Sequence, residues 1–248
     1  MISPQAEASL LRSQARGPEN DLLGKRLAMW SHLNLLEEIP KVNGSATLQI
    51  REEAQVQKQL YSVYETNASV CAPFMDYLGV SHITAPGTVV EWAARTNYLP
   101  MITAGQKPVF ADPASTLAAL MQPGFDPRQA VYLPIEARSA AAVPEACAAA
   151  VRSIHFRSRV VQFELEAPRV CVASVAQSFY RPWHAYVDGK PVQLWPANYA
   201  FQAVVVPAGR HQVRLVYEDA AFRAGAMISA VTLAGSIAAW FGLHRRIR

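Results

Sequence analysis

Four side chains between residues 183 and 199 are the strongest candidates for ligand chemistry in this sequence. They are three aromatic residues and one amide: Trp183, Trp195, Asn198 and Tyr199. An aromatic face suits stacking on a sugar ring, and a nearby amide can hydrogen-bond to its hydroxyl groups. The set therefore predicts carbohydrate binding. The alternative makes Trp183 and Tyr180 core anchors and Asn198 a turn or capping residue, because large aromatic side chains dominate core energetics.

The sequence carries none of the compact catalytic motifs. HExxH, the phosphate-binding P-loop, GxGxxG after a strand and GxSxG are all missing. The paired carboxylates Glu37-Glu38 and Glu52-Glu53 are sequence neighbours, so their side chains point to different faces of a helix or strand. Five histidines lack metal-ligand spacing, namely His32, His82, His155, His184 and His211. We therefore expect no catalytic residue, no metal and no cofactor in this chain.

The three cysteines, Cys71, Cys147 and Cys171, show neither CxxC nor metal-type spacing. Outside the cytoplasm they would allow one disulfide and one spare thiol. Buried inert thiols are the other interpretation, and the sequence leaves both open.

The charge of the chain is concentrated at its C-terminus. The formal net charge is +4, and Arg245, Arg246 and Arg248 supply three of these charges. The remainder is close to neutral, which argues against a nucleic-acid partner. A second basic run, Arg152, Arg157 and Arg159, is interpreted as a solvated strand face.

The segment Ala224–Leu243 contains no charged residue. Its twenty residues would span about 30 Å as a helix, the thickness of the bilayer's hydrocarbon core. Trp240 lies near one end, as an interfacial aromatic does. We predict a transmembrane helix over 223–243; an Ala/Gly-rich buried core helix is the alternative. Small and hydroxyl residues share one face and predict packing against other transmembrane helices through Gly225, Ser229, Thr232 and Ser236.

The flanking charges predict the orientation of this helix. The C-terminal side is rich in arginine, so the basic tail 244–248 is expected in the cytoplasm and the preceding residues outside. Met1–Asp21 has no apolar run suited to an export signal. We therefore expect a piece of a longer polytopic protein, the other option being the reverse orientation.

The residues after Arg157 are predicted to form short strands. Asp188-Gly189 between two apolar runs predicts a hairpin with a type I′ turn. We predict a second hairpin from Phe201–Val206 and His211–Tyr217, joined at Pro207-Ala208-Gly209. Short strands at this spacing are typical of an antiparallel β-sandwich or jelly-roll-like domain, placed at 151–219.

The N-terminal part mixes helix and strand signals. Helices are expected over Glu52–Tyr64, over Pro73–Leu78 and after the N-cap Asp112, with strands near 80–84, 88–93 and 131–133. The Ala-rich stretch Ala137–Ala150 is the candidate linker. The predicted fold class is α+β, with a mixed α/β subdomain at 26–150 behind a poorly ordered or short helical leader at 1–25.

The hairpin region resembles a known family. The run Ser178–Lys190 has a Tyr and a Trp before Val-Asp-Gly, as in the C-terminal extracytoplasmic region of the YfhO-like bacterial membrane proteins. The pattern continues with Asn198–Phe201, Val206–His211, Val213–Tyr217 and a terminal transmembrane helix.

Weaker similarities lie upstream. Leu33–Leu36 with Val42-Asn43-Gly44, Tyr77–Val80 and Asn97–Pro100 resemble further family elements, although Met101 stands where an arginine often follows. Together the similarities cover most of the chain after about Arg26.

The resemblance implies a polytopic protein of the bacterial inner membrane that looks like a lipid-dependent glycosyltransferase acting on cell-envelope polymers. The family's catalytic loop has no counterpart in these residues. The chain is thus expected to be a non-catalytic extracytoplasmic module whose partners are the bilayer, other helices and an envelope glycopolymer. Two further readings are a stand-alone membrane-anchored carbohydrate-binding protein and an enzyme with an unrecognised site in the N-terminal part.

Overall fold

The computed structural model describes residues 1–12, 17–44, 48–143 and 145–246, with side chains described as far as Trp240 in the last helix. Residues 13–16 of the predicted leader and residues 247–248 of the predicted basic tail lie outside this part. Mixed helices and antiparallel sheets confirm the α+β fold class.

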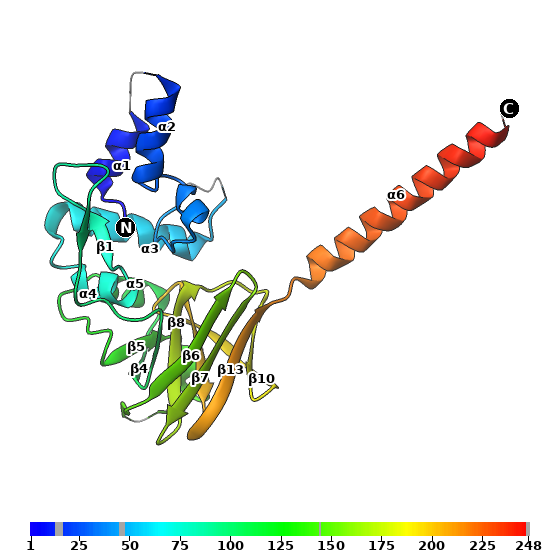
Figure 1. The fold of residues 1–248 in the computed structure, drawn as a ribbon. Coiled ribbons are helices and arrows are strands. Elements are labelled where there is room, and N and C mark those ends of the chain that lie inside the picture. The colour runs from blue at the N-terminus through cyan, green and yellow to red at the C-terminus, as the bar shows by residue number, and fades with distance from the viewer. Residues whose placement is uncertain (13–16, 45–47, 144, 247–248) are drawn as a thin grey trace.

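Two antiparallel sheets form a sandwich in the C-terminal half (Figure 1). The five-stranded sheet has the order β10-β9-β13-β7-β6, and the four-stranded sheet has the order β11-β12-β8-β3. Their bounds are β3 (Ile102–Ala104), β6 (Ala150–Arg157), β7 (Val160–Ala167), β8 (Cys171–Ser178), β9 (Trp183–Val187), β10 (Lys190–Val192), β11 (Leu194–Ala197), β12 (Phe201–Val206) and β13 (Gly209–Tyr217).

The β9–β10 hairpin has the predicted turn. Asp188 and Gly189 adopt φ values of 50° and 76°, the positive values that a type I′ turn needs, and Val187 pairs with Lys190. In β13, Val213 and Leu215 are buried while Gln212 and Arg214 are exposed, but Val216 is buried as well, so the alternation ends at Leu215.

The second predicted hairpin is wrong. β12 pairs with β8 and β11, whereas β13 pairs with β7 and β9 in the opposite sheet. The two strands pack face to face, with Val204 and Val206 in one core cluster with Val213 and Leu215. Period-two alternation identifies the buried face of a strand but not its neighbour in the sheet, so it does not separate the two arrangements.

The predicted linker is part of the packed structure. Ala137, Ala141 and Val143 are buried against Val172 of β8. The four-stranded sheet also takes in β3 from before residue 150. A three-residue strand shows no recognisable alternation, and small alanine side chains resemble linker composition even when they fill a core.

The N-terminal part packs around Leu60, Phe74 and Tyr77, in a core cluster that also includes Phe201 of β12. Asp112 caps α5 as predicted, because its Oδ1 accepts from the Ser115 N–H at 3.0 Å. The elements are α1 (Pro4–Leu11), α2 (Pro18–Leu27), η1 (Leu33–Glu37), α3 (Arg51–Asn67), α4 (Ala72–Tyr77), β1 (His82–Thr84), β2 (Trp92–Ala94), β4 (Lys107–Phe110), α5 (Pro113–Leu120), β5 (Ala130–Leu133) and η2 (Ile135–Arg138). β1 pairs with β2, and β4 pairs in parallel with β5.

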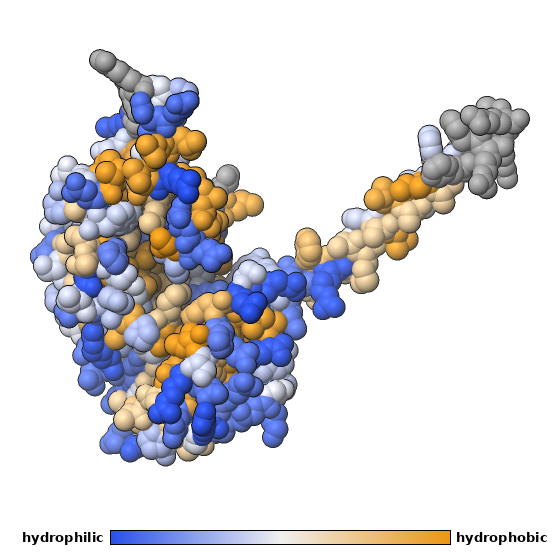
Figure 2. All heavy atoms as spheres, viewed as in Figure 1, coloured by the Kyte–Doolittle hydropathy of each residue, from blue (hydrophilic) through white to orange (hydrophobic). Residues whose placement is uncertain are grey.

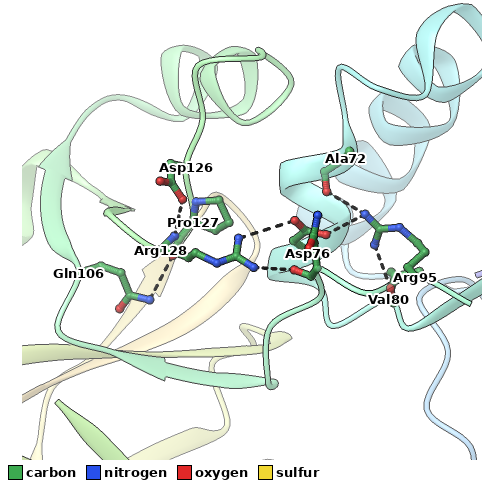
Figure 3. Close-up of polar contacts among 9 residues, drawn as sticks. Ala72, Asp76, Val80, Arg95, Gln106, Asp126, Pro127 and Arg128 are labelled. Carbon is green, nitrogen blue, oxygen red and sulfur yellow. Dashed lines mark hydrogen bonds and ion pairs between the residues drawn. The ribbon is translucent and has the colours of Figure 1, made fainter. Parts of the chain in front are cut away.

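A buried ion network joins α4 to the loops around it (Figure 3). The Arg95 guanidinium donates to Asp76 Oδ1 at 2.7 Å and also to the carbonyls of Val80 and Ala72. Arg128 approaches the other carboxylate oxygen of Asp76 at 3.7 Å. Asp76 therefore connects three separate segments of the N-terminal part.

α6 (Ala220–Arg246) leaves the end of β13 and runs away from the body (Figure 1). The helical segment Ala220–Trp240 is long and apolar enough to cross a membrane, and none of it is buried in the protein. The predicted transmembrane helix is thus present as a single exposed helix, which starts three residues earlier than expected.

Candidate functional site

A cleft of about 1250 Å³ separates the N-terminal part from the edge of the sandwich. One wall is η1 with the chain that follows it, and the other is the end of β6. The lining residues are His32, Asn34, Leu35, Glu38, Ile39, Pro40, Lys41, Val42, Asn43, Gly44, Glu53, Ile154, His155, Phe156, Arg157 and Ser158.

The η1 wall is an irregular segment held by side-chain hydrogen bonds. Met29, Ser31 and Glu38 all have positive φ, which costs non-glycine residues free energy. The Lys41 ammonium donates to the carbonyls of Met29 at 2.9 Å and Ser31 at 2.5 Å, and Asn34 Nδ2 donates to the Ile39 carbonyl at 2.7 Å. Burial lowers the pKa of Lys41 to about 8.

Asn43 supplies an acceptor without a donor. Its side chain is 5% exposed, and its Oδ1 has no hydrogen-bond partner among the described residues. An unsatisfied buried amide oxygen costs about 1–3 kcal/mol. Beside it, a side chain at Gly44 would lie 2.8 Å from His32 Cε1, so the imidazole packs directly on the glycine backbone.

The β6 wall carries two exposed apolar side chains among polar ones. β6 is an edge strand, and Ile154 and Phe156 are 38% and 40% exposed. The β6–β7 register shifts between Arg152 and His155, with Ser153 at φ 52°. Such a bulge bends the strand and re-aims the side chains beside it.

The cleft thus combines an aromatic wall with polar groups of both kinds. Phe156 offers a ring for stacking, Lys41 and Arg157 offer donors, and Glu38 and Glu53 offer carboxylate acceptors. A hydroxyl-rich, ring-shaped ligand matches this set. In the described part of the chain, no three His, Cys, Asp or Glu side chains are grouped in a way that could hold a metal ion.

The structure separates the four residues that the sequence singles out. Trp183 is 8% exposed in the sandwich core, where its ring lies edge-on to Tyr217 at 5.6 Å. Asn198 is buried, and it exchanges hydrogen bonds with the backbone of Tyr132. Trp183 is thus a core side chain and Asn198 a turn residue, the roles that the alternative to carbohydrate binding gives them.

Trp195 and Tyr199 lie on the four-stranded sheet side of the sandwich. Trp195 packs partly against the cluster around Val172, and the Tyr199 hydroxyl donates to Gln55 Oε1. The cavity beside Tyr199 has about 60 Å³, less than the ~150 Å³ known to hold benzene. Carbohydrate binding by the four residues stays a prediction, and the large cleft offers the better geometry.

Sequence reasoning missed the cleft because its walls are far apart in the chain. Neither Phe156 nor Lys41 belongs to a local motif. The one available signal was Val42-Asn43-Gly44, which appears among the family similarities without any assigned role.

The three cysteines are not joined by a disulfide bond. Cys71 and Cys171 are buried and Cys147 is half-buried, all as free cysteines. Burial raises the pKa of the Cys171 thiol to about 12, with further contributions from Cys147. A thiol with so high a pKa is a poor nucleophile at neutral pH.

The fold defines a class of protein: an antiparallel sandwich with a helical N-terminal part, followed at once by a helix able to cross a membrane. Residues 150–229, from β6 to the first turns of α6, match the family model described as bacterial membrane protein YfhO. The match confirms the resemblance that the hairpin motifs indicate, and it includes the β6 wall of the cleft. No curated protein and no solved structure matches the chain.

Proposed function

We propose that this chain is a non-catalytic extracytoplasmic module of a YfhO-like membrane protein in the glycosyltransferase-like class. Its role is to hold a cell-envelope glycopolymer in the cleft, at the extracytoplasmic face of the inner membrane. The observation that carries the proposal is continuity: the YfhO-like region runs without a break from the β6 wall into α6.

The chemistry of the cleft supports a carbohydrate ligand. Phe156 and Ile154 form an exposed apolar wall, and Lys41, Arg157, Glu38 and Glu53 supply charged groups around it that can hydrogen-bond to sugar hydroxyls. The proposed side of the membrane rests on Arg245, Arg246 and Arg248 at the C-terminal end of the chain, which the positive-inside rule assigns to the cytoplasm.

Binding of the detergent-solubilised full chain to purified bacterial cell-wall glycopolymer tests the proposal. Phe156→Ala removes a ring contact worth about 1 kcal/mol beyond its buried area, so we expect about fivefold weaker binding.

Trp195→Ala is the discriminating variant. It lies outside the cleft, so we expect unchanged binding. Loss of binding in Trp195→Ala with wild-type binding in Phe156→Ala would move the carbohydrate site to the aromatic residues of the hairpins. No binding by the wild-type chain would refute the carbohydrate role.

The small-residue face of α6 is proposed to pack on other transmembrane helices through Gly225, Ser229, Thr232 and Ser236. The hydroxyls of Thr232 and Ser236 donate to carbonyls of their own helix, at 2.9 and 2.8 Å, so they add little bulk or unpaired polarity to the face. Such a face permits close helix approach.

A further inference from the structure

The end of the sandwich next to α6 lies within reach of the membrane. Tyr217, the last residue of β13, pairs with Trp183, and its N–H donates to the Arg159 carbonyl at 2.9 Å. The apolar span begins at Ala220. Three residues extend at most about 10 Å, so the β6–β7 and β8–β9 turns lie within or beside the headgroup layer.

These two turns carry unpaired positive charge. Arg157 and Arg159 lie in or beside the β6–β7 turn, Arg181 lies in the β8–β9 turn, and all three are exposed. None of them makes an ion pair in the described part of the chain. Arg152, at the other end of β6, differs because it pairs with Glu166 at 3.7 Å.

The N-terminal arm, defined as residues 4–12 and 17–39 with α1, α2 and η1, continues this surface across the cleft. η1 faces the end of β6 over the cleft, and Leu35, Leu36 and Ile39 are exposed by 68%, 63% and 40%. Figure 2 shows apolar side chains gathered on the arm, on the side of the molecule from which α6 departs. The arm and the base of α6 therefore belong to one side of the protein (Figure 1).

α2 adds the strongest sign that this surface is covered. It has ten residues, and none of them is buried, while Leu22, Leu23 and Leu27 are all more than half exposed. Isolated helices of this length are marginal in water, so the helix needs a surface that covers its leucines.

We propose that the arm and the two arginine-bearing turns form one face that lies on the bilayer surface around α6. The arginines contact lipid phosphates, and the leucines of α2 and η1 enter the boundary between headgroups and acyl chains. Leucines on one side and cationic groups beside them are the composition of interfacial membrane segments. The proposal depends on α6 being a membrane span and not on carbohydrate binding.

Spin labels on the full chain in vesicles of phosphatidylcholine with phosphatidylglycerol test this face. Labels at Leu23→Cys and Leu36→Cys, in a Cys147→Ser background, are compared with Val170→Cys. Val170 is the matched control, because it is an apolar side chain, 45% exposed, beyond the end of β7 that lies away from α6. Val231→Cys in α6 gives the reference for a lipid-exposed site.

We expect collision with oxygen, relative to a water-soluble nickel complex, to be severalfold higher at positions 23 and 36 than at position 170. Values equal to those at position 170 would show that the face lies in water and would overturn the proposal. Low collision rates with both oxygen and the nickel complex would show that a protein partner, such as a second copy, covers the face. That result would also overturn the proposal.

The arginines are tested in the same vesicles. Arg157→Ser combined with Arg159→Ser should lower the ratio at position 36 at least twofold when phosphatidylglycerol is present. Arg152→Ser, the matched exposed arginine at the other end of β6, should leave it unchanged. An equal effect of both changes, or no effect of the double change, would remove the arginines from the membrane contact.

Discussion

Replacing Asp76 by alanine should detach the segments that form the N-terminal part. Asp76 is 7% exposed and accepts from Arg95 at 2.7 Å, while the Arg95 side chain is only 16% exposed. Removing one partner of a buried pair costs about 3–5 kcal/mol, because the other charge remains buried. In the variant, Arg95 still donates hydrogen bonds to the carbonyls of Val80 and Ala72. We therefore expect a loss of unfolding free energy near the lower end of this range, about 3 kcal/mol.

Arg128→Ala is the control within the same network. Its side chain is 46% exposed and lies 3.7 Å from the carboxylate, so the ion pair is worth less than about 1 kcal/mol. Guanidinium unfolding in detergent micelles, followed by tryptophan fluorescence, measures both variants. Equal losses of about 1 kcal/mol or less would refute the idea that the Asp76–Arg95 pair holds the segments together.

Three more predictions concern other parts of the structure. Gly105→Ala should destabilise the protein by more than the ~1–2 kcal/mol of a left-handed residue, because its Cβ would lie 2.2 Å from the Cys147 carbonyl oxygen; thermal unfolding measures this. Hydrogen bonding to Asp188 raises the pKa of His211, and the same contact lowers the pKa of Asp188. This pair should stabilise the fold fully between pH 3.8 and 6.5 and less as pH rises through the raised pKa of His211, which unfolding at pH 5.5–8.5 tests. The Lys41 amine, with a pKa of about 8, should react with acetic anhydride at pH 8 faster than the other lysines, as read by mass spectrometry.

Each of these predictions has its own control. Gly87 has φ +76° and open space around it, so Gly87→Ala should show only the backbone cost. The His211→Gln variant should lose the decline above pH 6.5. A pH-independent difference between His211→Gln and the wild type would contradict the pair. Exposed Lys190 provides the comparison for Lys41, and equal labelling rates would contradict the lowered pKa.

The sequence predicts local structure well here and long-range structure poorly. The turn at Asp188-Gly189 and the helix α6 were predictable because backbone conformation and bilayer thickness act on short stretches of chain. Sheet partners were not, since the apolar residues of β12 and β13 are compatible both with pairing of the two strands and with packing face to face. The ion network escaped prediction for a similar reason, because Asp76 and Arg128 are brought together only by the tertiary fold.

The candidate site illustrates the same limit. Composition drew attention to tryptophan and tyrosine, yet Trp183 fills the core because a large aromatic side chain stabilises most when it is buried. Phe156 gives no signal in the sequence, and its exposure follows from the place of β6 at the edge of the sheet. Edge position is a property of the assembled sheet and not of the strand.

A protease-accessibility experiment that determines on which side of the membrane the sandwich lies tests the central claim most directly. In spheroplasts of the bacterium that carries the protein, an added protease should cleave the module before Ala220, while a fluorescent protein fused after Arg248 stays intact and fluorescent. That result would place the cleft outside the cell, where envelope polymers are found. A protected module, with loss of the C-terminal fusion to protease, would place it in the cytoplasm and contradict the account.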